Sequence, residues 1–253
     1  MKGRRVLGYV GFVLFLVTVW WSTTGLDINW ERVMTGLPGA AAIVNLMFPP
    51  NWGYAGDVGG RLIETIHIAI VGTSIGAILA IPFGFLAAIN VSRSRLMVGF
   101  GKSLLNAIRT FPELLLAIVI MRGVGPGAFA GVLAMGVHSI GMLGKLYAEV
   151  VEGIDPGPVE ALQSTGANRI QTIWYGIIPQ VLPDFASYAL YRLEINIRAA
   201  SVLGLVGAGG IGIPLLFNLR ARIWDKVGMI LLGIIVVVTI VDYGSAYLRK
   251  RIV

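Results

Sequence analysis

The sequence predicts an all-α membrane protein with six transmembrane helices, and both its composition and its apolar runs indicate this fold class. Hydrophobic residues make up 56% of the 253 residues and charged residues only 13%, and the mean hydropathy of +0.81 lies well above that of ordinary soluble domains. The apolar residues gather in runs that reach or approach the roughly 20 residues needed to cross a bilayer. The 34 glycines suit closely packed membrane helices, and the lack of cysteine excludes disulfides, thiol catalysis and cysteine metal sites.

The first apolar run is predicted to be a retained helix. Lys2, Arg4 and Arg5 precede it and Trp20-Trp21 ends it, which suits an interfacial anchor better than a signal-peptide cleavage site. A single transmembrane domain is predicted over residues 1–253, with spans at about 6–21, 62–90, 103–121, 128–150, 184–206 and 227–248, an external segment at 22–61 and a cytoplasmic loop at 151–183. Part of the external segment is predicted to lie along the outer surface, because it has an apolar helical face made of Trp30, Val33, Met34 and Leu37.

The basic residues at the span ends predict the orientation. Six spans place both termini on one side of the membrane, and an inside N-terminus collects most Lys and Arg in inner segments, so both termini are predicted to be cytoplasmic. Orientation and contact with membrane lipid explain the net charge of +7, so nucleic-acid binding is not predicted. The inner basic residues are Lys2, Arg4, Arg5, Arg93, Arg95, Lys102, Arg169, Arg249, Lys250 and Arg251.

Residues 155–183 form the longest polar interruption between the apolar runs, and their pattern predicts two short helices joined at Gly166. Asp155 can cap the first helix, and two prolines follow it at positions where a missing N–H costs little. Glu160 lies in the first turn, against the positive end of the helix dipole. This first helix is therefore expected to begin directly after Asp155.

The second helix of this loop has an apolar stripe and is predicted to end at Pro179 and Pro183. A pair of short helices with one apolar face suits a membrane surface, where it can dock on a partner or lie as an interfacial amphipathic hairpin without one. The stripe has spacings of three and four and consists of Ile170, Ile173, Trp174, Ile177 and Ile178.

Ionisable side chains within the predicted spans are candidates for function, because they are costly in lipid. Arg109 and Glu113 are four residues apart on the third span, and Glu194 and Arg198 are four apart on the fifth, so each pair can share a helical face. Two interpretations stay open for these pairs and for Arg192. The charges can neutralise one another and set helix packing, or an arginine can face a path and bind an oxyanion with bidentate donors.

Several short motifs were considered for other chemistry. The run from Gly207 to Gly212 matches GxGxxG but lacks the strand and the ribose-binding acid of a dinucleotide site, so a flexible chain break after the fifth span is predicted. His138-Ser139 lies outside a nucleophile-elbow frame and is interpreted as a packed polar pair. With His67 the only other histidine, no metal site is predicted. No Walker motif is present, so ATP hydrolysis would need another chain.

The loop resembles the "EAA" signature of ATP-binding-cassette importer permeases, since Glu160-Ala161, Gly166 and Pro179 have its spacing. The resemblance implies a cytoplasmic loop that docks in a groove of a separate ATPase subunit. The chain departs from the signature at three positions, Leu162, Gly176 and Ile178. The implied coupling residues are Glu160, Ala161, Leu162, Gly166, Ala167 and Pro179.

Four further stretches resemble the permeases of phosphonate transporters, and with the second span they cover most of the chain from residue 47 onward. They are MFPPNW (47–52), RTFPELLLAIVI (109–120), GVHSIGMLGKLYAEVVEGIDPGPVEAL (136–162) and RLEINIRAASVLGLVGAGGIG (192–212). The resemblance implies a type I importer fold in a bacterial plasma membrane and a homodimer of permeases. It also implies two ATPase subunits that carry the ATP and Mg, and an external protein that delivers phosphonate, phosphite or phosphate.

For the site, the resemblance implies alternating access without a cofactor bound by this chain. The residues expected at the translocation path or gate are Arg109, Glu113, Arg192, Glu194, Arg198 and Ser201, and those expected at a hinge are Gly207, Gly209, Gly210 and Gly212. Two alternatives remain. One is an importer of the same type for another small solute such as methionine, and the other is an intramembrane enzyme, for which the sequence offers no clustered nucleophile and base.

Overall fold

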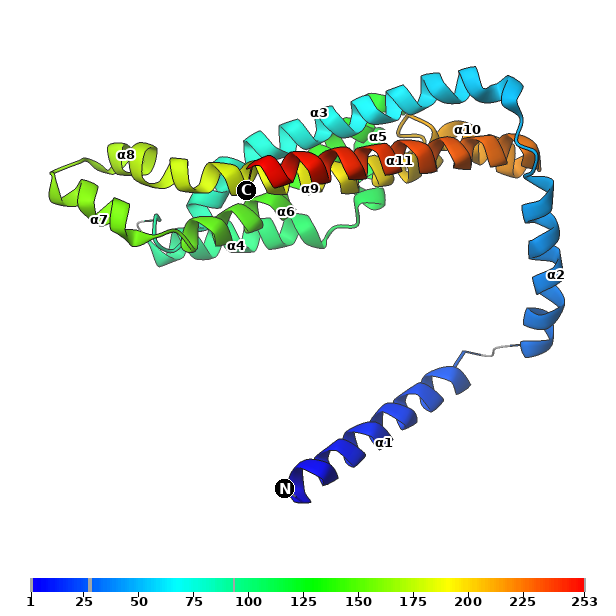
Figure 1. Ribbon diagram of the computed structural model, residues 1–253, viewed down its shortest axis with the longest axis horizontal. Coiled ribbons are helices and arrows are strands. Elements are labelled where there is room, and N and C mark those ends of the chain that lie inside the picture. The colour runs from blue at the N-terminus through cyan, green and yellow to red at the C-terminus, as the bar shows by residue number, and fades with distance from the viewer. Residues whose placement is uncertain (1, 27–28, 93, 253) are drawn as a thin grey trace. The chain divides into compact units, whose positions relative to one another are not determined.

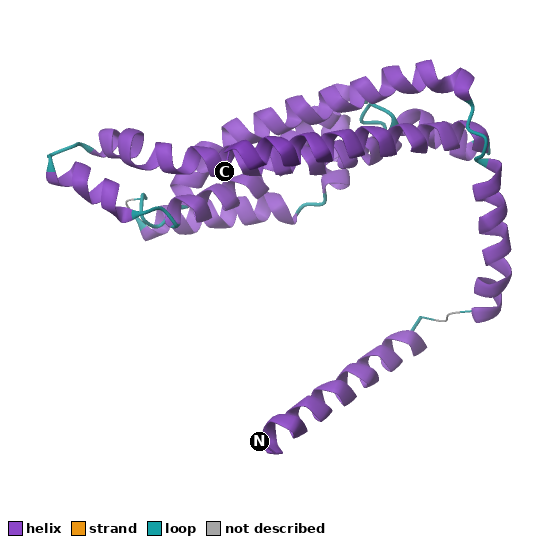
Figure 2. Ribbon diagram, viewed as in Figure 1, coloured by secondary structure: helices purple, strands orange, loops and turns teal. Residues whose placement is uncertain are grey.

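The computed structural model describes residues 2–26, 29–92 and 94–252, and nearly all of them lie in helices (Figure 2). Two compact units divide the chain at Phe48 and Pro49, and each is described by itself. Of the predicted inner basic residues, Arg93 lies outside the described part of the chain, as do the side chains of Lys2, Arg4 and Arg5.

The first unit consists of two helices, α1 (Lys2–Thr24) and α2 (Trp30–Leu46). Asn29 begins α2 as its N-cap, because its side-chain oxygen accepts a hydrogen bond from the Arg32 backbone N–H at 2.9 Å. The helix predicted in the external segment is therefore confirmed, and its apolar side chains are exposed. Its placement along a membrane surface stays a prediction.

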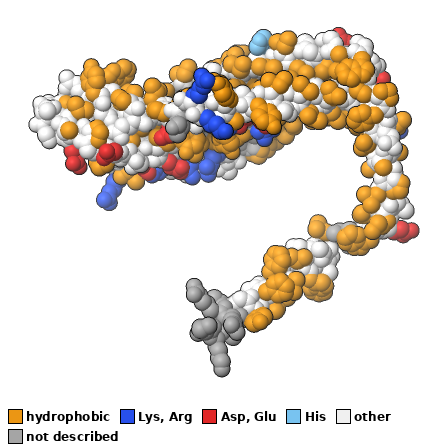
Figure 3. Space-filling model, viewed as in Figure 1, with side chains coloured by type: hydrophobic (Ala, Val, Ile, Leu, Met, Phe, Trp, Pro, Cys, Tyr) orange, Lys and Arg blue, Asp and Glu red, His pale blue; other side chains and the backbone are white. Residues whose placement is uncertain are grey.

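The second unit is a bundle of long helices that lie side by side, and a hairpin of short helices projects beyond one end of the bundle (Figure 1). Hydrophobic side chains cover much of the face seen in Figure 3, while acidic and basic side chains gather toward the hairpin end. The helices are α3 (Ala55–Ala87), α4 (Arg95–Thr110), α5 (Glu113–Val124), α6 (Ala128–Glu152), α7 (Pro156–Ser164), α8 (Arg169–Gln171), α9 (Ile178–Leu203), α10 (Gly212–Arg220) and α11 (Trp224–Ile252), with the short turns η1 (Trp52–Tyr54), η2 (Thr172–Ile177) and η3 (Gly204–Val206).

Helices α3 and α6 form the central packed pair, and small residues let their backbones approach closely. A Cβ atom added at Gly72 would lie 2.8 Å from the Met135 Cβ, and one at Gly76 would lie 2.4 Å from the Ser139 Cβ. Both distances are shorter than a non-bonded contact allows, so the crossing depends on glycine at these positions. Around this pair, buried apolar side chains from α5, α6 and α9 form a continuous core.

The glycine-rich segment after α9 breaks the helix as predicted, but it is closely packed. Gly209 and Gly210 have φ angles of 87° and 73°, which favour glycine. The Thr65 hydroxyl of α3 accepts a hydrogen bond from the Ile211 N–H at 2.8 Å, and the Glu64 carboxylate accepts one from the Gly210 N–H at 3.1 Å. The segment is therefore pinned to α3, and a hinge role for its glycines stays a prediction.

Four details of the predicted elements were wrong. The third span is broken at Phe111–Pro112, where α4 and α5 meet at 88°, because proline lacks the N–H that would continue the helix. The second helix of the hairpin does not end at Pro179 and Pro183. It passes through the π-helical turn η2 into α9, where Pro179 lies in the first turn and Pro183 is tolerated further along. Helix α10 was missed, and α3 begins before the predicted start at Leu62.

The chain is an all-α membrane protein. Among the described residues, three segments are long and apolar enough to cross a membrane, namely Trp52–Ala87, α6 and α11. Helices α4 and α5 together would make a fourth, broken span. The full count of six spans stays a prediction.

The hairpin of α7 and α8 is built by the local signals that the sequence shows. The Asp155 side chain accepts a hydrogen bond from the Gly157 N–H at 2.9 Å and caps α7, and Gly166 has a φ of 82° at the connection. Asn168 and Gln171 form a capping box at the start of α8. Gln180 closes the base, because its side chain bonds both backbone groups of Asp155. The predicted hairpin is confirmed.

Two of the departures from the EAA signature pack against each other. A Cβ atom at Gly176 in η2 would lie 3.0 Å from the Leu162 Cδ1 of α7, and Val159 is also in reach at 3.5 Å. A larger side chain at position 162 therefore fills the space that a missing side chain at position 176 leaves. The two departures therefore compensate each other in side-chain volume.

We expect Gly76→Ala to lower the stability of the purified protein, because the new methyl group would overlap the Ser139 Cβ. The expected cost is about 1–3 kcal/mol of unfolding free energy. Thermal unfolding in detergent measures it. Gly60→Ala is the matched control in the same helix, since no atom lies within 4 Å of its Cβ position. Equal melting temperatures for the two variants would contradict the packing argument.

We expect Gly176→Ile to loosen the hairpin and Leu162→Ala to restore it when both changes are combined. The single change overpacks the contact at a cost of about 1–3 kcal/mol, and the pair should show a coupling energy of about 0.5–3 kcal/mol. Amide hydrogen exchange over residues 156–180 reports the local opening. Additive effects of the two changes would show that these side chains do not share one space.

Candidate functional site

The predicted coupling residues lie along one hairpin, but they do not share one environment. Glu160 and Ala161 are exposed on α7, and Leu162 faces inward against η2. Gly166 is exposed at the tip, while Pro179 is exposed at the start of α9. The hairpin thus offers an exposed acidic and small-residue surface that its own packing does not use.

A cleft of about 360 Å³ separates the hairpin from the link between α3 and α4. Ala167 and Arg169 line it from the hairpin, and Asn90 and Ser92 line it from the link. Arg169 donates a hydrogen bond across it to the Val91 carbonyl oxygen. This contact ties the hairpin to the link between α3 and α4.

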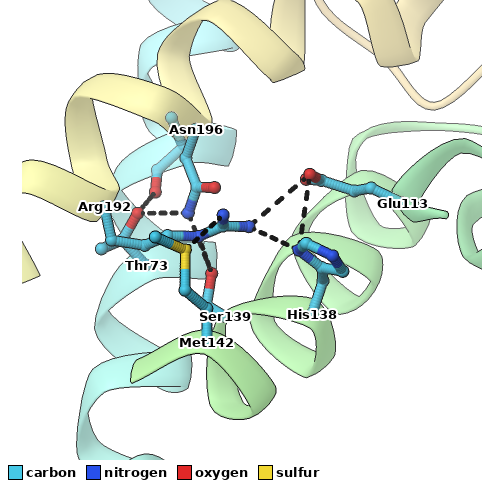
Figure 4. Close-up of polar contacts among 8 residues, drawn as sticks. Thr73, Glu113, His138, Ser139, Met142, Arg192 and Asn196 are labelled. Atoms are coloured by element: carbon cyan, nitrogen blue, oxygen red, sulfur yellow. Dashed lines mark hydrogen bonds and ion pairs between the residues drawn. The ribbon is translucent and has the colours of Figure 1, made fainter. Parts of the chain in front are cut away.

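A buried polar network around Arg192 is the main charged feature inside the bundle (Figure 4). The Arg192 side chain is only 3% exposed, and its Nε donates to the Ser139 Oγ at 2.9 Å. Its Nη2 donates to the His138 Nδ1 at 2.8 Å, and its Nη1 contacts the Met142 Sδ at 3.3 Å. The nearest carboxylate is Glu113, whose Oε2 lies 3.5 Å from Nη2. Three helices, α5, α6 and α9, therefore meet at one guanidinium.

The network continues to α3 through Asn196, which lies one helical turn after Arg192. The Asn196 amide donates to the Thr73 hydroxyl at 2.7 Å and to the Ser139 hydroxyl at 3.1 Å. The Thr73 hydroxyl donates in turn to the Ala69 carbonyl at 2.6 Å. Hydrogen bonds of this kind satisfy polar groups that lipid could not, and they fix the helices around them.

Neither of the same-helix ion pairs that the spacing allows is formed among the described residues. Glu194 pairs with Arg249 of α11 at 2.7 Å rather than with Arg198. Arg198 pairs with Asp242 of α11 at 3.1 Å. Glu113 begins α5 beyond the bend and faces Arg192, while Arg109 is exposed on α4. The pairs of Arg192, Glu194 and Arg198 therefore connect α9 with α5 and α11.

Four members of this network were not connected with Arg192 from the sequence, and the expected place of Ser201 at the translocation path stays a prediction. His138 and Ser139 were interpreted as a packed pair, and Thr73 and Asn196 were not considered. The signal was a polar side chain inside an apolar run, which is costly in a membrane and therefore informative. Ser201 is buried, but its hydroxyl donates to the Ile197 carbonyl of its own helix at 3.2 Å and does not join the network.

The comparisons with known proteins agree with this architecture. The chain is 41% identical to the phosphite transport system permease protein PtxC of Stutzerimonas stutzeri over 98% of this chain and 90% of the relative. It is 37% identical to the phosphate-import permease protein PhnE of Mycolicibacterium smegmatis over 90% of this chain and 43% of that longer relative.

Among solved structures, an inward-facing form of the MetNI methionine ABC transporter matches 80% of this chain and 99% of its own chain, with a TM-score of 0.69 at 18% identity. At that identity the likeness shows the fold alone. The model of one protein family, binding-protein-dependent transport system inner membrane component, matches residues 80–253. The chain belongs to this family of inner membrane transport permeases.

Proposed function

We propose that this chain is the transmembrane subunit of an ATP-driven importer that translocates phosphonate, phosphite or phosphate delivered by an external binding protein. The observation that carries the substrate class is the 41% identity, over nearly the whole chain, to a permease named for phosphite transport. The buried guanidinium of Arg192 supports it, because arginine binds the oxygens of such anions with paired donors.

The proposed topology has six spans formed by α1, α3, the broken pair α4 and α5, α6, α9 and α11. Helix α9 has 26 residues, long enough to cross, but it carries charged side chains. Among them Arg192, Glu194 and Arg198 each face an oppositely charged side chain on another helix, which lowers the cost of placing them in a membrane. Both termini and the hairpin are proposed to be cytoplasmic in a bacterial plasma membrane, with the basic end of α11 inside.

The proposed assembly contains two copies of this chain, two ATP-binding-cassette ATPase subunits and the external binding protein. The ATPases would dock on the hairpin at Glu160, Ala161 and Gly166, which its own packing leaves exposed. Leu162, Ala167 and Pro179 would shape that surface from behind or beside it. ATP and Mg would be held by the ATPases, since this chain has no Walker motif.

The proposed mechanism is alternating access. Closure of the two ATPases on ATP would draw the two hairpins together, and the continuous helix from η2 into α9 would carry that movement into the bundle. Rigid-body motion of α9 and its neighbours then opens the path outward, and hydrolysis returns it inward. The Arg169 contact to the α3–α4 link would transmit the same movement to α3.

Neither alternative is favoured. The likeness to the methionine transporter supports the fold and gives no reason to prefer a neutral amino-acid-like solute. An intramembrane enzyme does not fit a chain that belongs to a family of transport permeases.

We expect the reconstituted complex to hydrolyse ATP faster when the binding protein is loaded with one of phosphite, phosphate or methylphosphonate. The loaded protein would favour the closed ATPase pair, because it binds only the outward-facing permease. ATPase rates in proteoliposomes, with unloaded binding protein as the control, measure the effect. Stimulation by methionine alone would overturn the proposed substrate class.

We expect Glu160→Lys to abolish co-purification of the ATPase and uptake, while the permease still inserts in the membrane. Glu160 is exposed and its carboxylate is free to meet a partner, so charge reversal acts on docking rather than folding. Affinity purification and uptake assays check this. Glu31→Lys, an exposed reversal on α2, should keep ATPase association. Normal ATPase binding by Glu160→Lys would contradict the docking surface.

A further inference from the structure

The guanidinium of Arg192 has donor capacity that its neighbours do not use. An arginine side chain carries five N–H bonds. Three of them have acceptors in the described structure, on Ser139, His138 and Met142, at 2.9, 2.8 and 3.3 Å. The second N–H of Nη2 meets only the Glu113 Oε2, at the long distance of 3.5 Å, and one N–H of Nη1 has no acceptor among the described residues. The two terminal nitrogens of a guanidinium can together donate to one oxyanion.

The Glu113 carboxylate occupies the position of that anion without fully bonding there. Its Oε2 lies 3.5 Å from the Arg192 Nη2, and its Oε1 is buried without a hydrogen-bond partner in the described structure. Its other neighbour is the His138 Nδ1 at 3.7 Å, which accepts from Arg192 and so offers no proton to a second acceptor. Glu113 therefore supplies the compensating charge in a poor geometry, as Figure 4 shows.

The position of Glu113 in the fold allows its carboxylate to move away from Arg192. It is the first residue of α5, directly after the 88° bend at Phe111–Pro112. Among the residues of α5, all of them described, Ala117 is buried, and Leu116, Ile120 and Met121 pack against the core. Glu113 precedes this packed stretch at the first position of the helix. The Glu113 and His138 side chains are 16% and 17% exposed, whereas the Arg192 side chain is 3% exposed, so Glu113 and His138 form the more exposed side of the network.

We propose that Arg192 is the contact for the oxyanion in the translocation path and that Glu113 is its internal counter-anion, which the substrate displaces and which returns when the substrate leaves. The inference rests on the proposed function and names the residues that would meet its substrate. Oxygens of a phosphite, phosphate or phosphonate would accept the N–H of Nη2 that now faces Glu113 and the N–H of Nη1 that has no acceptor among the described residues. Ser139 and His138 are positioning residues, because they hold the guanidinium in its plane.

The counter-anion has a kinetic consequence. A buried arginine with no competitor would hold an oxyanion strongly and release it slowly, whereas a carboxylate that returns to the same donors shortens the bound time. Removal of Glu113 should therefore tighten binding and slow transport together. A purely structural carboxylate would slow transport without tightening binding.

Binding is tested with the complete permease–ATPase complex in detergent, without the binding protein, and with inorganic phosphite as the probe. For Glu113→Ala we expect phosphite to raise the melting temperature, with a half-saturating concentration at least about tenfold below that of the wild type. Arg192→Lys, which keeps the charge but not the paired donors, should lose the phosphite effect. If Glu113→Ala does not assemble, Glu113→Gln removes the charge with the shape kept, and the same shift is expected.

Glu152→Ala is the matched control, because it also removes a partly buried carboxylate from a basic side chain, that of Lys102, at 2.9 Å, and Glu152 is not among the residues expected at the path. Its half-saturating phosphite concentration should equal that of the wild type. A similar shift in this variant, or none in Glu113→Ala and Glu113→Gln, would overturn the inference. Methionine, the probe without net charge, should not raise the melting temperature of any variant.

Uptake by the reconstituted transporter separates this inference from the proposed function. For Glu113→Ala we expect the apparent KM for phosphite and the maximal rate both to fall, by about tenfold in the rate. If phosphite stimulates ATP hydrolysis by the wild type but the Glu113→Ala variant has an unchanged KM, the role of Glu113 is overturned. The proposed importer function would then still stand. A wild type that none of the three oxyanions stimulates would overturn the proposed substrate and the inference with it.

Discussion

The close approach of α3 and α6 is the constraint on which the interior depends. Glycines 72 and 76 bring the two backbones together, and this places the hydroxyls of Thr73 and Ser139 within reach of one amide, that of Asn196. Ser139 in turn accepts from Arg192, so the position of the guanidinium follows from the crossing of two other helices. In water such hydrogen bonds would add little, but in a bilayer each unsatisfied group costs several kcal/mol. The small residues at the crossing of α3 and α6 therefore determine where the buried charge of Arg192 can be bonded.

Local signals allowed the hairpin to be predicted from the sequence. The ion-pair partners could not be predicted, because they depend on tertiary contacts. The Asp155 cap and the positive φ at Gly166 act within a few residues, so the sequence around them is sufficient. The partners of Glu194 and Arg198 are on α11, far away in the chain, and spacing along one helix cannot reveal them. Pro112 ended a helix as its chemistry demands, while Pro179 and Pro183 did not. The difference is that Pro179 lies in a first turn and follows a π-helical turn that absorbs the irregularity.

The departures from the EAA signature illustrate how a family pattern and a structure inform each other. Leu162 and Gly176 are separate mismatches in the sequence, yet their atoms meet in the fold. Compared with the signature, the side chain at position 162 is larger and the one at position 176 is missing, so the contact between them stays filled. Glu160 itself still matches the signature. A pattern is therefore better judged by the contacts it encodes than by the number of letters that match.

The ion pair of Arg198 and Asp242 has a consequence for how the chain meets its solvent. Both side chains are about half exposed, at 53% and 42%, although both helices belong to the bundle. Acyl chains cannot solvate such a pair, so this side of α9 and α11 must meet water or another polypeptide. Ile240, two residues before Asp242 and 64% exposed, points to the other side of α11, where lipid is a suitable neighbour. The pair of charges therefore requires a polar neighbour at its own level of α9 and α11.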